Sequence, residues 1–191
     1  MVNALIAARA AVDRADSLGF TALIYAAQEG FDAIVDCLIR VAGASVHHVN
    51  FEGRTVLHMA TQLGRVGVVR LLLRAGANPN IVSTDGMRAT PIYIATQNGH
   101  LAILEALIEV GANVNHIMAN GTTSLMLAAN EDRIDIVRAL LAAGADPLIA
   151  ITEAGPFNGS TALDVAKALN HSAIIALLEA RLAELAAAGS P

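Results

Sequence analysis

The sequence predicts an all-α protein in which antiparallel helix pairs stack into an α-solenoid, and three observations lead to this prediction. A threonine recurs every 33 to 38 residues, and the apolar residues that follow it keep nearly the same spacing in each copy. A residue that tolerates left-handed backbone ends each short apolar stretch. The two apolar stretches of one copy cannot bury their apolar sides without neighbours, so the copies are expected to stack.

Each copy begins with a threonine that is expected to cap a first helix. A threonine oxygen accepts a hydrogen bond from the N–H groups of a first turn, and Pro91 follows Thr90 where a missing N–H costs nothing. An aliphatic residue stands two positions after the threonine and an alanine five positions after it. The small alanine lets two helices approach closely. The five threonines are Thr21, Thr55, Thr90, Thr123 and Thr161.

The first helix of each copy is expected to be short, about two turns, because a stopping residue follows the threonine by nine positions. A second helix then runs to a glycine in the first four copies, and a turn or extended hairpin leads onward. The last helix, from Ser172 to about Ala188, is longer and suits a terminal cap. The stopping residues are Gly30, Gly64, Gly99, Asp132 and Asn170 for the first helices, and Gly43, Gly76, Gly111 and Gly144 for the second.

This pattern resembles the ankyrin repeat. It reads G-x-T-x-L-x-x-A, then I/V-V-x-x-L-L, then G-A-x-x-N, and the clearest copy runs from Gly53 to Asn80. The family's Thr-Pro-Leu-His tetrapeptide is nowhere complete. We expect one ankyrin-repeat domain over residues 1–191. Its expected parts are a capping or partial repeat at 1–15, repeats at 16–49, 50–84, 85–117 and 118–152, a C-terminal capping repeat at 153–188 and a tail at 189–191.

Composition excludes several classes of protein. The chain is 55% hydrophobic, which a disordered chain is not. Its net charge of −5 and aromatic content of 3% argue against nucleic-acid binding. No window of about 18 residues is free of charge, so we expect no membrane insertion, and the start lacks the features of a signal peptide. The single cysteine, Cys37, favours a reducing compartment, hence an intracellular, cytoplasmic protein.

No motif for catalysis or metal binding is present, so the sequence predicts a protein that is not an enzyme and holds no cofactor or metal. Phosphate loops, G-x-S-x-G, H-E-x-x-H and C-x-x-C are all missing. His58 and His100 are expected to brace turns with hydrogen bonds. A metal site from Cys37, His47 and His48 would have no recognised spacing. Asn80 and Asn115 stand where the ankyrin family is sometimes hydroxylated, but pinning a turn explains them on sequence alone.

The resemblance implies that a partner protein or peptide binds the concave side, formed by turn tips and the exposed face of the first helices. Leu18, Phe20, Phe51 and Leu63 would be its apolar anchors, although Phe20 and Phe51 could instead fold back onto neighbouring turns. The long connections at 82–89 and 149–158 are further candidates for contacts. The expected partner-binding residues are Leu18, Phe20, Gln28, Glu29, Phe51, Glu52, Arg54, Gln62, Leu63, Arg88, Gln97, Asn98, Thr122, Asn130 and Glu131.

Three functions remain open. The leading hypothesis is a non-catalytic protein-interaction module that acts as a monomer. The alternative is a regulatory or docking segment of a larger enzyme or channel. A binder of small molecules or nucleic acid fits the acidic, aromatic-poor composition least well.

Overall fold

The computed structural model describes residues 11–151 and 158–188, and in them the chain forms ten α-helices. The chain divides into two compact units, Met1–Ala112 and Asn113–Pro191, which are described separately. The all-α prediction is confirmed: within the described ranges the only strand-like pairing is an isolated bridge between Val49 and Thr55. Most of the expected N-terminal capping segment, the tail at 189–191 and the middle of the connection at 149–158 lie outside the described residues.

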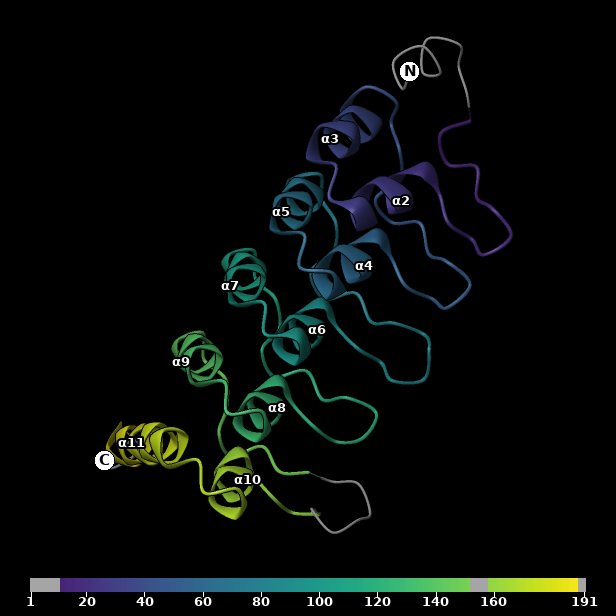
Figure 1. The fold of residues 1–191 in the computed structure, drawn as a ribbon. Helices are drawn as coiled ribbons and strands as arrows, with labels where there is room; N and C mark the ends of the chain where they lie inside the picture. The colour runs from purple at the N-terminus through teal and green to yellow at the C-terminus, as the bar shows by residue number, and fades with distance from the viewer. Residues whose placement is uncertain (1–10, 152–157, 189–191) are drawn as a thin grey trace. The chain divides into compact units, whose positions relative to one another are not determined.

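The first unit contains three helix pairs (Figure 1). The first helices α2, α4 and α6 pack side by side as one layer, and the second helices α3, α5 and α7 form another. Their bounds are α2 Ala22–Glu29, α3 Asp32–Arg40, α4 Val56–Gln62, α5 Val66–Arg74, α6 Pro91–Asn98 and α7 Leu101–Glu109. Turns of the chain lead into α2, α4 and α6 and project beyond the first layer.

The second unit contains two helix pairs with the same internal arrangement. Helix α8 packs on α9 and α10, and α11 packs on α9 and α10. The bounds are α8 Ser124–Asn130, α9 Ile134–Ala142, α10 Ala162–Ala168 and α11 Ser172–Ala188. The long final helix therefore begins and ends where the sequence predicts.

The helix boundaries follow the expected caps. All five threonines precede a first helix with extended backbone, and the Thr21, Thr123 and Thr161 side chains accept a first-turn N–H. The Thr90 side chain makes no such bond, and Pro91 stands at the first position of its helix, where a missing N–H costs nothing. Asp132 and Asn170 take left-handed φ values of 53° and 59°, as the glycines of the other copies do. Composition alone would not have identified these two as helix stops; the repeat register did.

The repeated apolar positions form the core. The alanine five residues after each threonine is buried in every copy, and so is the leucine seventeen residues after it. Only Leu163 and Ile175 of this apolar set remain half-buried. Both belong to the α10–α11 pair, and no further helix pair among the described residues packs on their outer side.

Candidate functional site

The predicted partner-binding residues lie on two kinds of surface: the turns before the first helices, and the C-terminal ends of those helices. In the first unit Phe20, Gln28 and Arg54 are half-buried, and the others are exposed. In the second unit Thr122 is half-buried while Asn130 and Glu131 are exposed and bonded to each other at 3.1 Å. The exposed residues of the first unit are Leu18, Glu29, Phe51, Glu52, Gln62, Leu63, Arg88, Gln97 and Asn98.

The first turn is tied together by Asp16. Its carboxylate accepts the N–H groups of Leu18 and Phe20 at 2.8 and 2.9 Å, and the Tyr25 hydroxyl at 2.6 Å. The Tyr25 bond, followed by the backbone bonds, lowers the pKa of Asp16, and the same contact raises the pKa of Tyr25. Phe20 packs edge-to-face on Tyr25, with ring centroids 5.6 Å apart. Leu18 is left 60% exposed at the tip.

The second turn is organised in the same way by Asn50. Its side-chain oxygen accepts the N–H groups of Glu52 and Arg54, at 3.0 and 2.9 Å. Phe51, between them, is 79% exposed. The sequence left open whether Phe20 and Phe51 are exposed anchors or fold back onto their neighbours. In the structure Phe20 folds back onto Tyr25, and Phe51 is exposed to solvent.

The first two turns touch each other through backbone. The Phe51 N–H donates to the Leu18 carbonyl at 3.4 Å, and the His48 ring bonds the Gly19 carbonyl at 2.9 Å. Gly19 has a φ of 78°, and a Cβ there would lie 3.0 Å from the Phe51 nitrogen. A side chain at position 19 would thus be both strained and crowded. The close contact holds Leu18 and Phe51 on neighbouring tips.

The second and third turns are joined by an ion pair. Arg54 donates two hydrogen bonds to one Asp85 carboxylate oxygen, at 2.9 and 3.0 Å, and a third to the Gln62 side chain at 3.0 Å. Partial burial alone would raise the pKa of Asp85, but bonds from Ser83, Arg54 and Met87 outweigh it and hold that pKa below 3.8. The longer connection at 82–89 therefore forms an internal contact, and Arg54 is braced within the protein.

We predict that Arg54 and Asp85 stabilise the fold together. A double-mutant cycle of Arg54→Ala and Asp85→Ala should give a coupling of about 0.5–1.5 kcal/mol in the free energy of unfolding, measured by urea denaturation. Because the folded-state pKa of Asp85 is lowered, the coupling should be full above pH 3.8 and disappear as pH falls through the lowered value. Additive single-variant effects would contradict the prediction.

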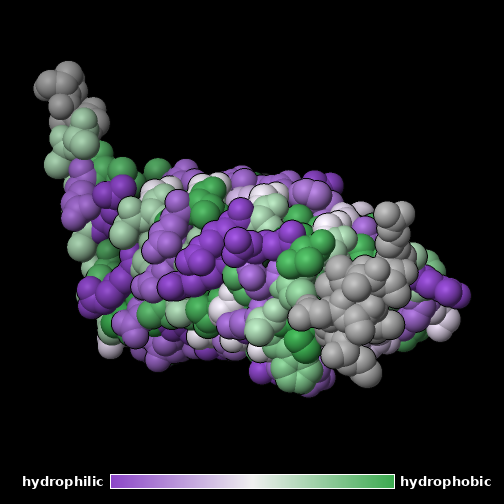
Figure 2. All heavy atoms as spheres, turned by 90° about the horizontal axis from the view of Figure 1, so that it is seen from above, coloured by the Kyte–Doolittle hydropathy of each residue, from purple (hydrophilic) through white to green (hydrophobic). Residues whose placement is uncertain are grey.

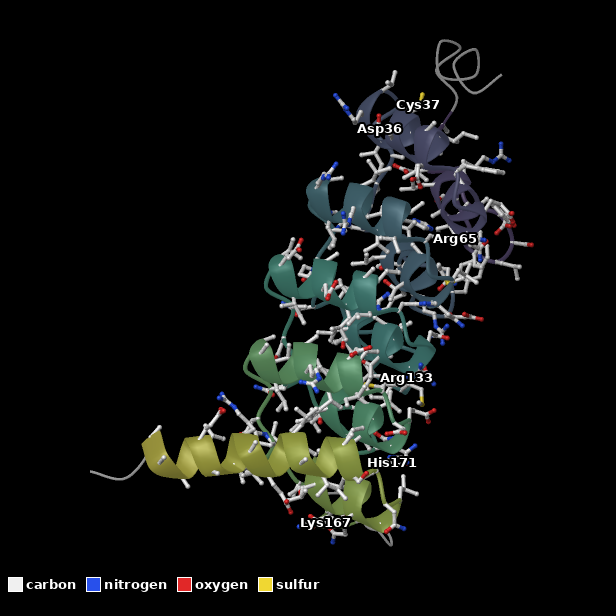
Figure 3. The ribbon with its side chains drawn as sticks, turned by 60° about the vertical axis from the view of Figure 1, so that its left-hand side comes forward. Asp36, Cys37, Arg65, Arg133, Lys167 and His171 are labelled. Carbon is white, nitrogen blue, oxygen red and sulfur yellow. The ribbon has the colours of Figure 1, made fainter. Side chains whose placement is uncertain are left out.

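The C-terminal ends of the first helices are also braced by the following copy. Arg65 donates to the Gln28 carbonyl at 2.7 Å, and His100 bonds the Gln62 carbonyl at 3.3 Å. In the second unit His171 bonds the Ala129 carbonyl at 2.8 Å. Figure 3 labels Arg65 and His171 at these junctions. These bonds satisfy carbonyl groups that a helix end leaves without an intrahelical partner. They therefore hold the backbone at the C-terminal ends of the first helices in place.

Other candidate groups have structural roles. His100 braces a turn as predicted, and His58 is buried and bonds Thr55 and the Ala89 carbonyl. Asn80 and Asn115 donate to the Gly111 and Gly144 carbonyls, which agrees with the turn-pinning interpretation. Within 11–151 and 158–188, no cluster of three or more His, Cys, Asp or Glu side chains could hold a metal ion.

The surface is mixed in character. Figure 2 shows hydrophilic side chains over much of the visible face, with hydrophobic ones in separate patches. None of the helices in the described part of the chain is both long enough and apolar enough to cross a bilayer. A groove of about 380 Å³ lies between α3 and α5, lined by Asp32, Asp36, Arg70 and Arg74. It is open to solvent, and none of the predicted binding residues lines it.

Sequence comparisons agree with the repeat pattern. The family described as ankyrin repeats (3 copies) matches residues 1–83 and 78–151. The mouse nuclear factor NF-kappa-B p105 subunit is 30% identical to this chain over 136 residues, which make up 70% of the chain and 14% of that protein. The chain thus spans a small part of the length of this relative.

Proposed function

Because the chain belongs to the ankyrin-repeat family, whose members are generally protein-interaction modules, we propose that it binds a partner protein or peptide without catalysis. The proposed site consists of the turn tips and first-helix ends described above. It includes the fifteen residues predicted from the sequence, of which Phe51, Leu18 and Leu63 are the main apolar anchors. The module is proposed to act as a monomer in the cytoplasm.

One observation carries this proposal: large apolar side chains are exposed on two turns and at one helix end whose backbone is held by internal hydrogen bonds. Leu18, Phe51 and Leu63 are 60%, 79% and 45% exposed. The Asp16 side chain fixes the backbone around Leu18, and the Asn50 side chain fixes it around Phe51. The Arg54 guanidinium reaches from the second turn to Gln62, the neighbour of Leu63. A rigid apolar anchor loses little conformational entropy on binding, so more of its burial becomes affinity.

A second candidate function is that of a regulatory or docking segment within a larger protein. The observation that favours it is the comparison with the mouse p105 subunit, in which the matching region forms only 14% of the length. Under this proposal the same tips would bind another domain of one polypeptide. An isolated chain would then bind that domain when it is added separately.

We predict that a partner is lost when two anchors are removed. Wild-type protein and a Phe51→Ala, Leu63→Glu variant would be used to capture proteins from a lysate of the source cells, followed by mass spectrometry. A partner retained by wild type should fall at least about tenfold with the variant, because truncating central anchors costs about 2 kcal/mol or more.

The matched control carries Val41→Ala and Val110→Glu. These valines are also exposed, but they follow the second helices α3 and α7. The control should retain the partner, and circular dichroism should show equal helicity for all three proteins. Equal capture by wild type and both variants would exclude the proposed face. Light scattering of the purified chain tests the proposed monomer.

A further inference from the structure

Aromatic side chains are concentrated on the first two turns. The whole chain contains four Phe, two Tyr and no Trp, and three of these six, Phe20, Tyr25 and Phe51, lie on or next to these turns. We propose that Leu18, Phe20, Tyr25 and Phe51, here called the tip patch, form the primary docking site. Its proposed occupant is a partner segment that presents an apolar anchor next to Lys or Arg. This inference rests on the proposed function and names the chemistry of its partner.

The tip patch is linked by one backbone hydrogen bond and one ring contact. The Phe51 N–H bonds the Leu18 carbonyl, which places the two most exposed anchors on adjoining backbone. The Phe20 and Tyr25 rings pack edge-to-face, and Tyr25 is itself 48% exposed. Aromatic residues are enriched at the positions that carry binding energy, because a large rigid side chain buries much area at small entropic cost.

The carboxylates Asp16 and Glu52 and the cation Arg54 stand beside the tip patch. Asp16 precedes Leu18 by two residues, and hydrogen bonds hold its pKa below 3.8, so it is ionised at neutral pH. Glu52 follows Phe51, and its side chain is 67% exposed. Its cation neighbour, Arg54, lies 4.0 Å away but donates two hydrogen bonds to Asp85. The charge of Arg54 is therefore largely offset within the protein.

A partner with a cation beside its apolar anchor would complement this arrangement. The Glu52 side chain is exposed, whereas the Asp16 carboxylate is already bonded to Leu18, Phe20 and Tyr25, so Glu52 is the expected contact for a Lys or Arg side chain. Such a rim contact would contribute chiefly to the association rate and to partner choice. The anchor in the patch would supply most of the affinity.

The other described turns differ. The third turn carries Met87 and Arg88 at its tip and no aromatic residue. The turn before α8 carries Asn120 and Thr122, which bond to each other at 2.7 Å. Each of these turns exposes one large apolar residue, Met87 or Ile117, and neither carries a Phe or Tyr, so the tip patch differs from them in its aromatic content.

The test is a selection of random twelve-residue peptides displayed on phage against the purified chain. Enriched peptides should place an aromatic residue or leucine within three positions of Lys or Arg. Their affinity, measured by fluorescence anisotropy, should fall at least tenfold with Phe51→Ala. Peptide affinity should fall three- to tenfold with Glu52→Lys. This loss should be smaller at high salt, because salt screens the exposed charge.

Two further variants make the outcome decisive. Val110→Ala, a change at an exposed valine outside the site, should leave peptide affinity unchanged. Glu109→Lys reverses an exposed carboxylate at the end of α7, outside the proposed site, and should change affinity less than twofold. Phe51 is exposed, so its loss leaves the core intact, and thermal melting checks this.

Each other result overturns the proposal. Peptides with acidic or uncharged flanks, peptides indifferent to Phe51→Ala, or no enrichment at all would contradict it. If enriched peptides instead depend on Gln62 and Leu63, the tip patch is excluded while the proposed function stands. If no variant on the turns or first-helix ends alters capture of a partner protein, the proposed function fails as well.

Discussion

Replacing His58 with alanine is expected to lower the free energy of unfolding by about 2–4 kcal/mol. The imidazole is fully buried and joins two copies of the repeat. Its Nδ1 accepts the Thr55 N–H at 3.1 Å, which leaves the proton on Nε2 to donate to the Ala89 carbonyl at 3.2 Å. Alanine would leave both backbone groups without their partner and open a cavity. Urea denaturation followed by circular dichroism measures the effect.

His100→Ala is the matched control for this prediction. His100 stands in the next copy and also bonds a carbonyl, but it is only half-buried and that bond is longer, 3.3 Å. Water can replace the His100 ring as the partner of the carbonyl, so the free energy of unfolding should fall by less than about 1 kcal/mol. If His58→Ala cost no more than His100→Ala, the bridging role of His58 would be wrong.

The same histidine should make stability depend on pH. Burial is the largest influence and lowers the pKa of His58 below its ordinary value of 6.5. Between the two pKa values the unfolded chain binds the proton and the folded chain does not. Stability is therefore full above pH 6.5 and falls as pH drops below it. Urea denaturation at about pH 7.5 and about pH 5.5 should show this fall in wild type and a smaller one in His58→Ala.

Leu72→Ala should have an effect of similar or greater size, about 2–5 kcal/mol. Leu72 stands on α5 at the position seventeen residues after the threonine, and none of its side chain reaches solvent. Truncation removes its transfer free energy and leaves a cavity, because packed helices on both sides close it only partly. Urea denaturation again provides the measurement.

Leu63→Ala is the control for Leu72→Ala. The same chemical change at a residue 45% exposed at the end of α4 should cost about 0.5 kcal/mol or less. This control has a second use, because it shows whether the Leu63 position tolerates the interface variants. Comparable losses at positions 63 and 72 would contradict the assignment of core and surface.

The repeat register determined most of the local structure. A threonine cap needs only the extended backbone and free N–H groups of a helix start, so Thr21 or Thr123 could be assigned without tertiary information. Asp132 and Asn170 were assigned as left-handed stops because they stand in register with glycines. The buried alanines followed for the same reason: a period shared by five copies identifies the face on which they pack.

The organisation of the turn tips was not predictable in the same way. Asp16, Asn50 and Asp85 recur five residues before a repeat threonine, where an Asp or Asn is a known cap for the N–H of a turn tip, but this recurrence does not reveal their partners beyond the turn. The Arg54–Asp85 pair joins residues in different copies, and only folding brings them together. The repeat register marks the turn residue, but it does not indicate which cation of a neighbouring copy will pair with it.

The sequence by itself determined the family, the helix pairs, their caps and the apolar core, because each depends on a short-range pattern that recurs. Only the tertiary structure decided which tip side chains are available. Phe20 stands one residue before a repeat threonine and Phe51 stands four residues before one; the first packs on Tyr25, and the second is 79% exposed. The reason is physical: a side chain on a turn has no helical period to orient it, so its direction depends on which neighbours the fold brings near.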